Sequence, residues 1–228
     1  MKYALILGFA FLVSASAETL HYSIEWPSGL SLGEATLRSD RTAGGTEGAP
    51  GWEFELNLDA SVPGFAIRDH YASTANPDFC SWTLDKKVAR GSRTSEERVI
   101  FDPAKTVATR ETVRGTQIAG TSELTVPTCA RDALTLLQFV RRELQQGRLP
   151  SAQPAILGAL YQVRLEYLGT AAVRLGNQQM DADRFRTSIK GPASDFTLES
   201  FFARDAARTP VMIKIPLSIA TFTVELIP

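Results

Sequence analysis

Residues 129–147 read CARDALTLLQFVRRELQQG, the one segment of the chain with the periodicity of an amphipathic helix. Its apolar side chains share one face, at Ala133, Leu136, Leu137, Val140 and Leu144. Its polar side chains fall largely off that face, at Arg131, Asp132, Gln138, Arg141, Arg142, Gln145 and Gln146. Thr128 is the predicted N-cap, and Gly147 with Pro150 predicts the end. A helix with one apolar face needs a sheet on which to pack.

The rest of the chain alternates apolar and polar residues in the manner of antiparallel strands. In the clearest case, Trp52 and Phe54 alternate with Glu53 and Glu55. The expected strands cover residues 19–26, 30–38, 52–59, 65–73, 79–88, 93–101 and 107–113, then 155–168, 185–189, 196–202, 211–215 and 221–227. Residues 39–50, rich in Gly and Thr, predict a mobile loop. We therefore expect a mainly β fold in one domain over 18–228, a curved antiparallel sheet or half-barrel meander packed around one central amphipathic helix.

The N-terminus has the features of a signal peptide. Lys2 is a minimal basic region, residues 3–13 are apolar but too short to span a bilayer, and Ala15-Ser16-Ala17 has the small-residue pattern that precedes cleavage. We predict cleavage after Ala17 and a periplasmic or secreted protein, with a retained N-terminal anchor as the alternative. No later stretch is apolar enough for a transmembrane helix, so none is expected in the mature chain.

Charge and cysteine content narrow the classes of function. The formal net charge is −1 and no Lys/Arg-rich run occurs, so nucleic acid is not an expected partner. In an oxidising compartment, two cysteines predict one disulfide, Cys80–Cys129, with two separate buried thiols as the alternative. Two cysteines and two histidines show no metal-ligand spacing, and no cofactor motif is present, so we expect no metal and no cofactor.

The chain offers few candidates for catalysis. Gly29-Leu-Ser31-Leu-Gly33 matches the nucleophile elbow of hydrolases, but that elbow needs a helix after the serine and the residues here are strand-like. His21 and His70 are interpreted as surface residues of alternating strands. Asp69 neighbours His70 but points to the opposite face, so the two form no dyad. Asp181 and Asp183 are interpreted as part of an exposed turn.

Several short segments together resemble a known family: GEA (33–35), CARDAL (129–134), RREL (141–144) with Gly147, YQV (161–163), GPAS (191–194), FARD (202–205), RTP (208–210) and TFTVEL (221–226). The chain resembles the exported bacterial family known as domain of unknown function 3108, over most of its mature length. The family's Asp-x-x-Ser before the helix is replaced by Cys129-Ala-Arg-Asp132. The resemblance implies an envelope location and a predominantly antiparallel β fold, and it implies no reaction and no catalytic residue.

These observations favour a non-catalytic exported envelope protein that binds an apolar ligand such as a lipid, or an envelope partner protein. A structural or assembly factor with a dry core is the second hypothesis, and a serine hydrolase using Ser31 with His70 is the third. A pocket between the helix and the sheet would favour the first hypothesis.

Overall fold

One antiparallel sheet of 14 strands carries the fold in the computed structural model, which describes residues 17–43, 49–62, 64–218 and 220–228. Before the helix the strands are β1 Glu18–Glu25, β2 Ser31–Thr42, β3 Gly51–Val62, β4 Phe65–Ala75, β5 Ser81–Arg90, β6 Arg93–Asp102, β7 Val107–Arg114 and β8 Gln117–Thr125. After α1 (Ala133–Gln145) come β9 Gln153–Ile156, β10 Leu160–Leu175, β11 Gln178–Lys190, β12 Asp195–Ala203, β13 Pro210–Pro216 and β14 Thr221–Leu226.

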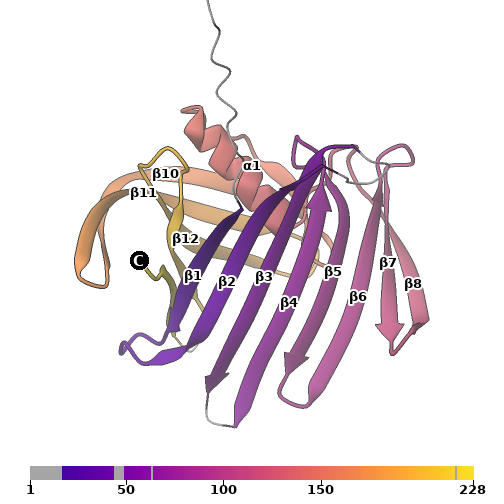
Figure 1. The fold of residues 1–228 in the computed structure, drawn as a ribbon, viewed down its shortest axis with the longest axis horizontal. Coiled ribbons are helices and arrows are strands. Elements are labelled where there is room, and N and C mark those ends of the chain that lie inside the picture. Colours follow the sequence, from indigo (N-terminus) through magenta and orange to yellow (C-terminus); the bar gives the residue numbers. More distant parts are fainter. Residues whose placement is uncertain (1–16, 44–48, 63, 219) are drawn as a thin grey trace, which may run out of the picture.

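The strands lie in the order β8-β7-β6-β5-β4-β3-β2-β1-β14-β13-β12-β11-β10-β9, so β8 and β9 are the two edges. The sheet curves until the wall of β1–β8 faces β10–β12, with α1 between them at the upper end in Figure 1. The chain before α1 bridges the two walls there. The amide of Ser81 donates to the carbonyl of Ala130 (2.9 Å), and the amide of Ile156 donates to that of Arg131 (2.8 Å). The predicted curved antiparallel sheet around one helix is confirmed.

The helix is shorter at its start than predicted. It begins after Asp132, whose carboxylate accepts hydrogen bonds from the amides of Leu134 (2.8 Å) and Thr135 (3.1 Å), so Thr128 as N-cap was wrong. The residues before Asp132 are extended because they bridge the sheet walls. The predicted end is confirmed, because Gly147 has φ +69° and donates to the carbonyl of Leu144 in a Schellman-type cap.

The buried surface of α1 is wider than the single predicted face. Leu136, Val140 and Leu144 pack on the wall of β10–β12, whereas Leu134 packs on β1–β4. The prediction was wrong for Ala133, which is exposed. It was also wrong for four predicted off-face residues that are buried, Arg131, Asp132, Gln138 and Arg141. A helix enclosed by a curved sheet is covered from more than one side, so its burial cannot follow one stripe.

Several strand boundaries also differ from the predictions. β8 was not predicted, because its side chains are almost all exposed and no apolar face marks it. The predicted strand 155–168 is divided into β9 and β10 by a turn at Gly158, and β10 continues to Leu175. β2 extends to Thr42, so the predicted loop over 39–50 begins later, and residues 44–48 lie outside the described residues.

Candidate functional site

The space between α1 and the sheet is filled by side chains. The two clusters on either side of α1 include Phe54 and Phe79 from the first half of the chain and Phe185 and Phe202 from the second, all at most 7% exposed. In the described part of the chain these side chains pack the space between α1 and the sheet, so this region gives the first hypothesis no support. The better candidate lies at the seam, where the first wall of the sheet meets the β9–β10 turn.

The seam holds a cavity of about 200 Å³. Its apolar lining comes from both sides of the seam, with Leu84, Val99, Ala108 and Leu124 on β5–β8, and Ile156 and Ala159 at the β9–β10 turn. Strand register explains the first set, because Leu84 pairs with Val99, and Ala108 with Leu124, which places them on one face. The hydrophobic cluster of Phe101, Val126 and Ala130 borders this lining. We call this space the seam cavity.

Three charged side chains share the face of the seam cavity. Lys86 pairs with Glu97 across β5 and β6, with the ammonium 3.6 Å from the carboxylate. Arg110 on β7 donates from Nε to Ser122 Oγ (3.2 Å) and from a terminal nitrogen to the Gly158 carbonyl (3.5 Å). No carboxylate among the described residues pairs with Arg110. Glu123, which pairs with Thr109 across β7 and β8, also borders the cavity. Because Lys86 is paired with Glu97, Arg110 is the cation of this lining that has no carboxylate partner among the described residues.

Sequence reasoning missed these residues. Glu97 points inward toward Lys86, but it stands in a run of charged residues, Glu96 to Arg98, that carries no apolar alternation. Lys86 follows Leu84 at strand spacing, and that alternation was the available signal. The position of Arg110 could not be deduced, because its neighbour Ser122 lies on the unpredicted β8 and Gly158 lies across the seam.

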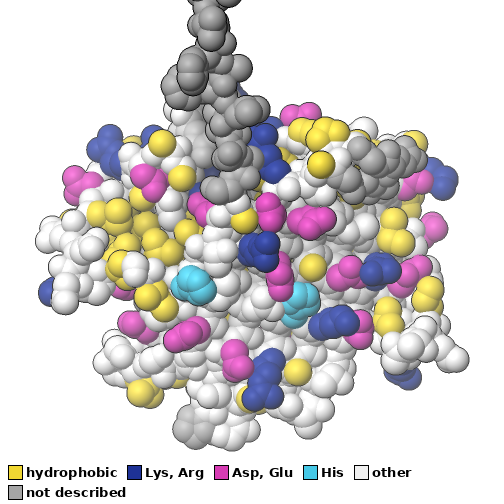
Figure 2. Space-filling model, in the orientation of Figure 1, with side chains coloured by type: hydrophobic (Ala, Val, Ile, Leu, Met, Phe, Trp, Pro, Cys, Tyr) yellow, Lys and Arg dark blue, Asp and Glu magenta, His cyan; other side chains and the backbone are white. Residues whose placement is uncertain are grey.

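A larger hollow of about 900 Å³ lies on the outer face of β2–β7. Its charged groups pair with one another: Arg68 with Asp59 (3.4 Å), and Lys87 with Glu96 (2.8 Å). His70 also lies here, with Nδ1 2.7 Å from the side-chain oxygen of Asn57. Figure 2 shows acidic and basic side chains interspersed over this side of the molecule. The hollow is larger than the seam cavity, but most of its charged groups are paired and it is open to water, so it is the weaker candidate.

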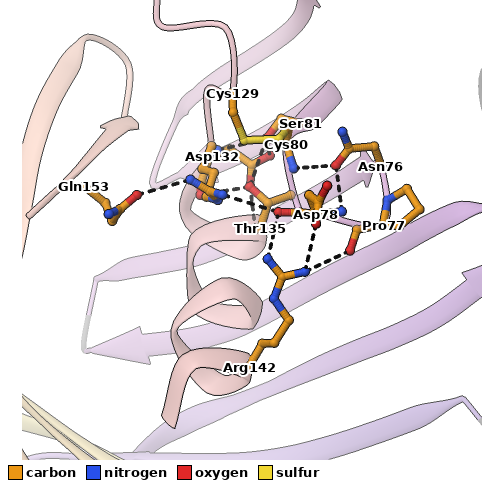
Figure 3. Close-up of a disulfide and its surroundings, with 11 residues drawn as sticks. Asn76, Pro77, Asp78, Cys80, Ser81, Cys129, Asp132, Thr135, Arg142 and Gln153 are labelled. Carbon is orange, nitrogen blue, oxygen red and sulfur yellow. Dashed lines mark hydrogen bonds and ion pairs between the residues drawn. A yellow bond between two sulfur atoms is a disulfide. The ribbon is translucent and has the colours of Figure 1, made fainter. Parts of the chain in front are cut away.

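The disulfide lies beside the start of α1 (Figure 3). Cys80 and Cys129 are bonded, with Cα atoms 4.8 Å apart, as the sequence predicted. Next to them Asp132 is completely buried, and its carboxylate accepts hydrogen bonds from the hydroxyls of Ser73 and Ser81 as well as from the cap amides. Burial raises the pKa of Asp132, and these hydrogen bonds oppose the rise. Every oxygen of this cluster has a partner, so its role is to hold the helix start.

Two arginines complete the disulfide region. Arg131 lies with its guanidinium 3.9 Å from the centroid of the Phe139 ring and donates to Gln153 (3.2 Å) and to the carbonyl of Asp78 (3.3 Å). Burial, together with the charge of Arg142, lowers the pKa of Arg131. Arg142 donates to the carbonyl of Pro77 at 3.1 Å. These contacts tie the start of the helix and Arg142 to the β4–β5 turn, and Arg131 Nε is buried without a hydrogen-bond partner.

The remaining sequence candidates are not brought together. Ser31 is exposed at the start of β2, so a strand follows it where a nucleophile elbow needs a helix. His21 is exposed and lies 3.4 Å from Thr36. The interpretation of 181 and 183 as an exposed turn was wrong, because both lie within β11 and the carboxylate of Asp183 pairs with Arg208 at 2.7 Å. Among the described residues, no group of His, Cys, Asp and Glu has the arrangement of a metal site.

Comparison with known proteins shows which solved structures have a similar fold and which family model the sequence matches. A β-barrel-like protein of domain family DUF1849 from Brucella abortus is similar, with TM-score 0.63, 4% identity, and coverage of 92% of this chain and 94% of that chain. A protein described as exported, with a YmcC-like fold, from Bacteroides fragilis matches with TM-score 0.31 and 9% identity, covering 91% of this chain and 92% of that chain. The search of curated proteins gave no match.

Within the described residues, α1 is too short and too polar to cross a membrane as a helix. The model of the family described as "Protein of unknown function (DUF3108)" matches residues 19–227. That match spans all 14 strands and α1, apart from the first residue of β1. The chain therefore belongs to the DUF3108 family of proteins of unknown function.

Proposed function

We propose that this protein is a non-catalytic, exported envelope protein that binds an anionic amphiphile, a lipid-like molecule with one charged end, at the seam cavity. The observation that carries the proposal is Arg110, an inward-facing cation without a carboxylate partner among the described residues, beside an apolar lining. Transfer of a hydrocarbon chain from water to such a lining lowers the free energy. A guanidinium binds a phosphate or carboxylate through paired hydrogen bonds.

The size of the cavity limits the ligand. A volume of about 200 Å³ is below the range of roughly 300–1,000 Å³ that is typical of sites for drug-sized molecules. The seam cavity therefore suits one end of a single acyl chain, with the remainder extending along the seam. A two-chain lipid would require the β9–β10 turn around Gly158 to move away from β7 and β8.

Dodecyl phosphate and dodecyl maltoside test this proposal, since they share a chain and differ in head-group charge. We expect Arg110→Gln to weaken dodecyl phosphate binding about tenfold in calorimetry, from the loss of a charged hydrogen bond, and to leave dodecyl maltoside unchanged. Ala159→Phe, which fills the cavity, should weaken both ligands. Arg164→Gln is the matched control, because Arg164 is exposed on β10 with no partner among the described residues. Equal effects of the two arginine changes would contradict a head-group role for Arg110.

A structural or assembly factor remains the second candidate, and the filled space around α1 favours it. Such a factor needs a rigid core and no ligand. Absence of binding for both detergents, together with no lipid in native mass spectra of the protein purified from the envelope, would favour this candidate over the binding protein.

A further inference from the structure

Five turns of the sheet lie at one end of the molecule. Alternate turns of an antiparallel meander share an end, which groups the β1–β2, β3–β4, β5–β6 and β7–β8 turns at the lower end in Figure 1, away from α1. The β13–β14 turn joins them, because Thr223 pairs with Glu25 and the rings of Trp26 and Phe222 lie 5.0 Å apart. We call this surface the hairpin end; its described residues lie within 26–30, 62–65, 90–93, 114–118 and 216–221.

Large apolar side chains project into solvent from the hairpin end. Leu30 is 63% exposed, Ile118 59%, Leu217 54%, Phe65 44% and Val62 37%. They belong to four different turns and include half of the large hydrophobic residues that are exposed in the described part of the chain. The sequences of three turns, PSGL (27–30), SVPGFA (61–66) and LSIA (217–220), contain no charged residue. Exposed apolar groups gathered on one surface indicate a contact surface.

The hairpin end also carries unpaired positive charge. Arg93 and Arg114 stand at the β5–β6 and β7–β8 turns, and neither pairs with a carboxylate among the described residues. At the opposite end, Lys105 pairs with Asp102 at 2.9 Å and Arg142 with Asp78 at 3.3 Å, and Arg41 stacks on the ring of Trp52. Apolar tips beside free arginines therefore distinguish one end of the molecule from the other.

We propose that the hairpin end docks on the surface of an anionic lipid bilayer. Apolar tips can enter the boundary between head groups and acyl chains while arginines bind lipid phosphates. A bilayer accepts separate tips without shape complementarity, whereas a protein partner requires a continuous, closely packed interface. Docking in this way directs the strands away from the membrane and keeps α1 on the far side. The proposal is independent of any ligand in the seam cavity.

Co-sedimentation of the mature protein with vesicles tests the proposal. Wild type should bind vesicles of phosphatidylglycerol and phosphatidylethanolamine more tightly than vesicles of phosphatidylcholine. Leu30→Ser combined with Leu217→Ser should weaken binding to both vesicles by about tenfold or more, from lost burial of two leucines. Arg93→Gln combined with Arg114→Gln should weaken binding about fivefold for each arginine, with phosphatidylglycerol vesicles only.

Matched controls distinguish docking through the hairpin end from non-specific binding by other parts of the surface. Leu149→Ser and Arg164→Gln remove an exposed leucine and an unpaired arginine elsewhere on the surface, and should leave vesicle binding unchanged. Thermal melting should show that the variants remain folded, since every changed residue is exposed. Failure of wild type to bind either vesicle would overturn the proposal. The proposal would also be overturned if wild type bound no vesicles but self-associated, and if the leucine double variant were monomeric. That result would assign the hairpin end to contacts between copies of this chain.

Discussion

Asp132 combines two opposing effects on one carboxylate. It caps α1 and accepts hydrogen bonds from Ser73 and Ser81, yet it is completely removed from water. Burial is the larger effect and raises its pKa. In the unfolded chain an aspartate titrates near pH 4, so above that pH the folded protein holds the proton more tightly than the unfolded chain does. Stability from this residue therefore falls as pH rises from that value through the raised folded pKa.

Asp132→Asn tests this sign, because asparagine keeps the capping oxygen and has no proton to lose. We expect the free energy of unfolding of wild type minus that of the variant to decrease as pH rises from about 4 toward neutrality. Urea denaturation at a series of pH values measures the difference and cancels the other titrating groups. A difference that grows with pH would mean that the hydrogen bonds outweigh burial. Asp132→Ala should cost about 1–3 kcal/mol near pH 4, since the cap amides and serine hydroxyls lose their acceptor. This cost should decrease with rising pH as it does for the asparagine variant, because alanine does not titrate either.

At the scale of the element, the burial of α1 predicts which positions tolerate a charge. Val140 is 4% exposed within the cluster on β10–β12, so Val140→Asp should cost at least about 3 kcal/mol from an unpaired buried carboxylate. Ala133→Asp is the control, because Ala133 is exposed in the first turn, where negative charge favours the helix dipole. We expect that change to stay within about 0.5 kcal/mol. Similar shifts of the melting temperature for both variants would refute the assigned faces.

The same element shows why polar residues of α1 are buried. Gln138 donates to Ser39 at 2.9 Å, and Arg141 forms an ion pair with Glu18 at 2.6 Å. These contacts reach the top of β1 and β2, on a side of the helix that periodicity assigned to solvent. Gln138→Asp changes a residue that the apolar repeat places off the packed face. We nevertheless expect it to be destabilising, because it removes the donor to Ser39.

At the scale of the whole molecule, the disulfide joins the β4–β5 turn, at the residue before β5, to the segment that bridges the two sheet walls. Its bond closes a loop with a sequence separation of 49, for which the chain-entropy model predicts about 4 kcal/mol of stabilisation. Replacement of Cys80 and Cys129 together by alanine should lower the free energy of unfolding by about that amount in urea, at any pH that leaves the bond intact. Peptide mapping without reductant should find the two cysteine peptides linked in wild type. Free thiols at both positions would contradict the assignment.

Processing is a second property of the whole chain. The predicted cleavage after Ala17 would leave Glu18 as the first residue, at the beginning of β1 and paired with Arg141. We expect N-terminal sequencing of protein recovered from the envelope to begin at Glu18. Recovery of intact Met1 would instead support a retained anchor.

Local patterns by themselves determined much of this protein. Alternation identified most of the strands, the apolar repeat located α1, Gly147 marked its end, and the cysteine count paired Cys80 with Cys129. These features could be deduced because strand and helix periods are properties of neighbouring residues. The family resemblance over the same residues agrees with them.

Only the tertiary structure decided what each face contacts. Periodicity describes a helix lying on one surface, and it could not show a sheet that encloses α1 and buries Gln138 and Arg141. It missed β8, because an edge strand exposed on both faces needs no alternation. The seam cavity likewise depends on Arg110 meeting Gly158, residues brought together only when the sheet curves until its edges approach. Curvature of a sheet sums small twists over many strands, and no short window of sequence contains that sum.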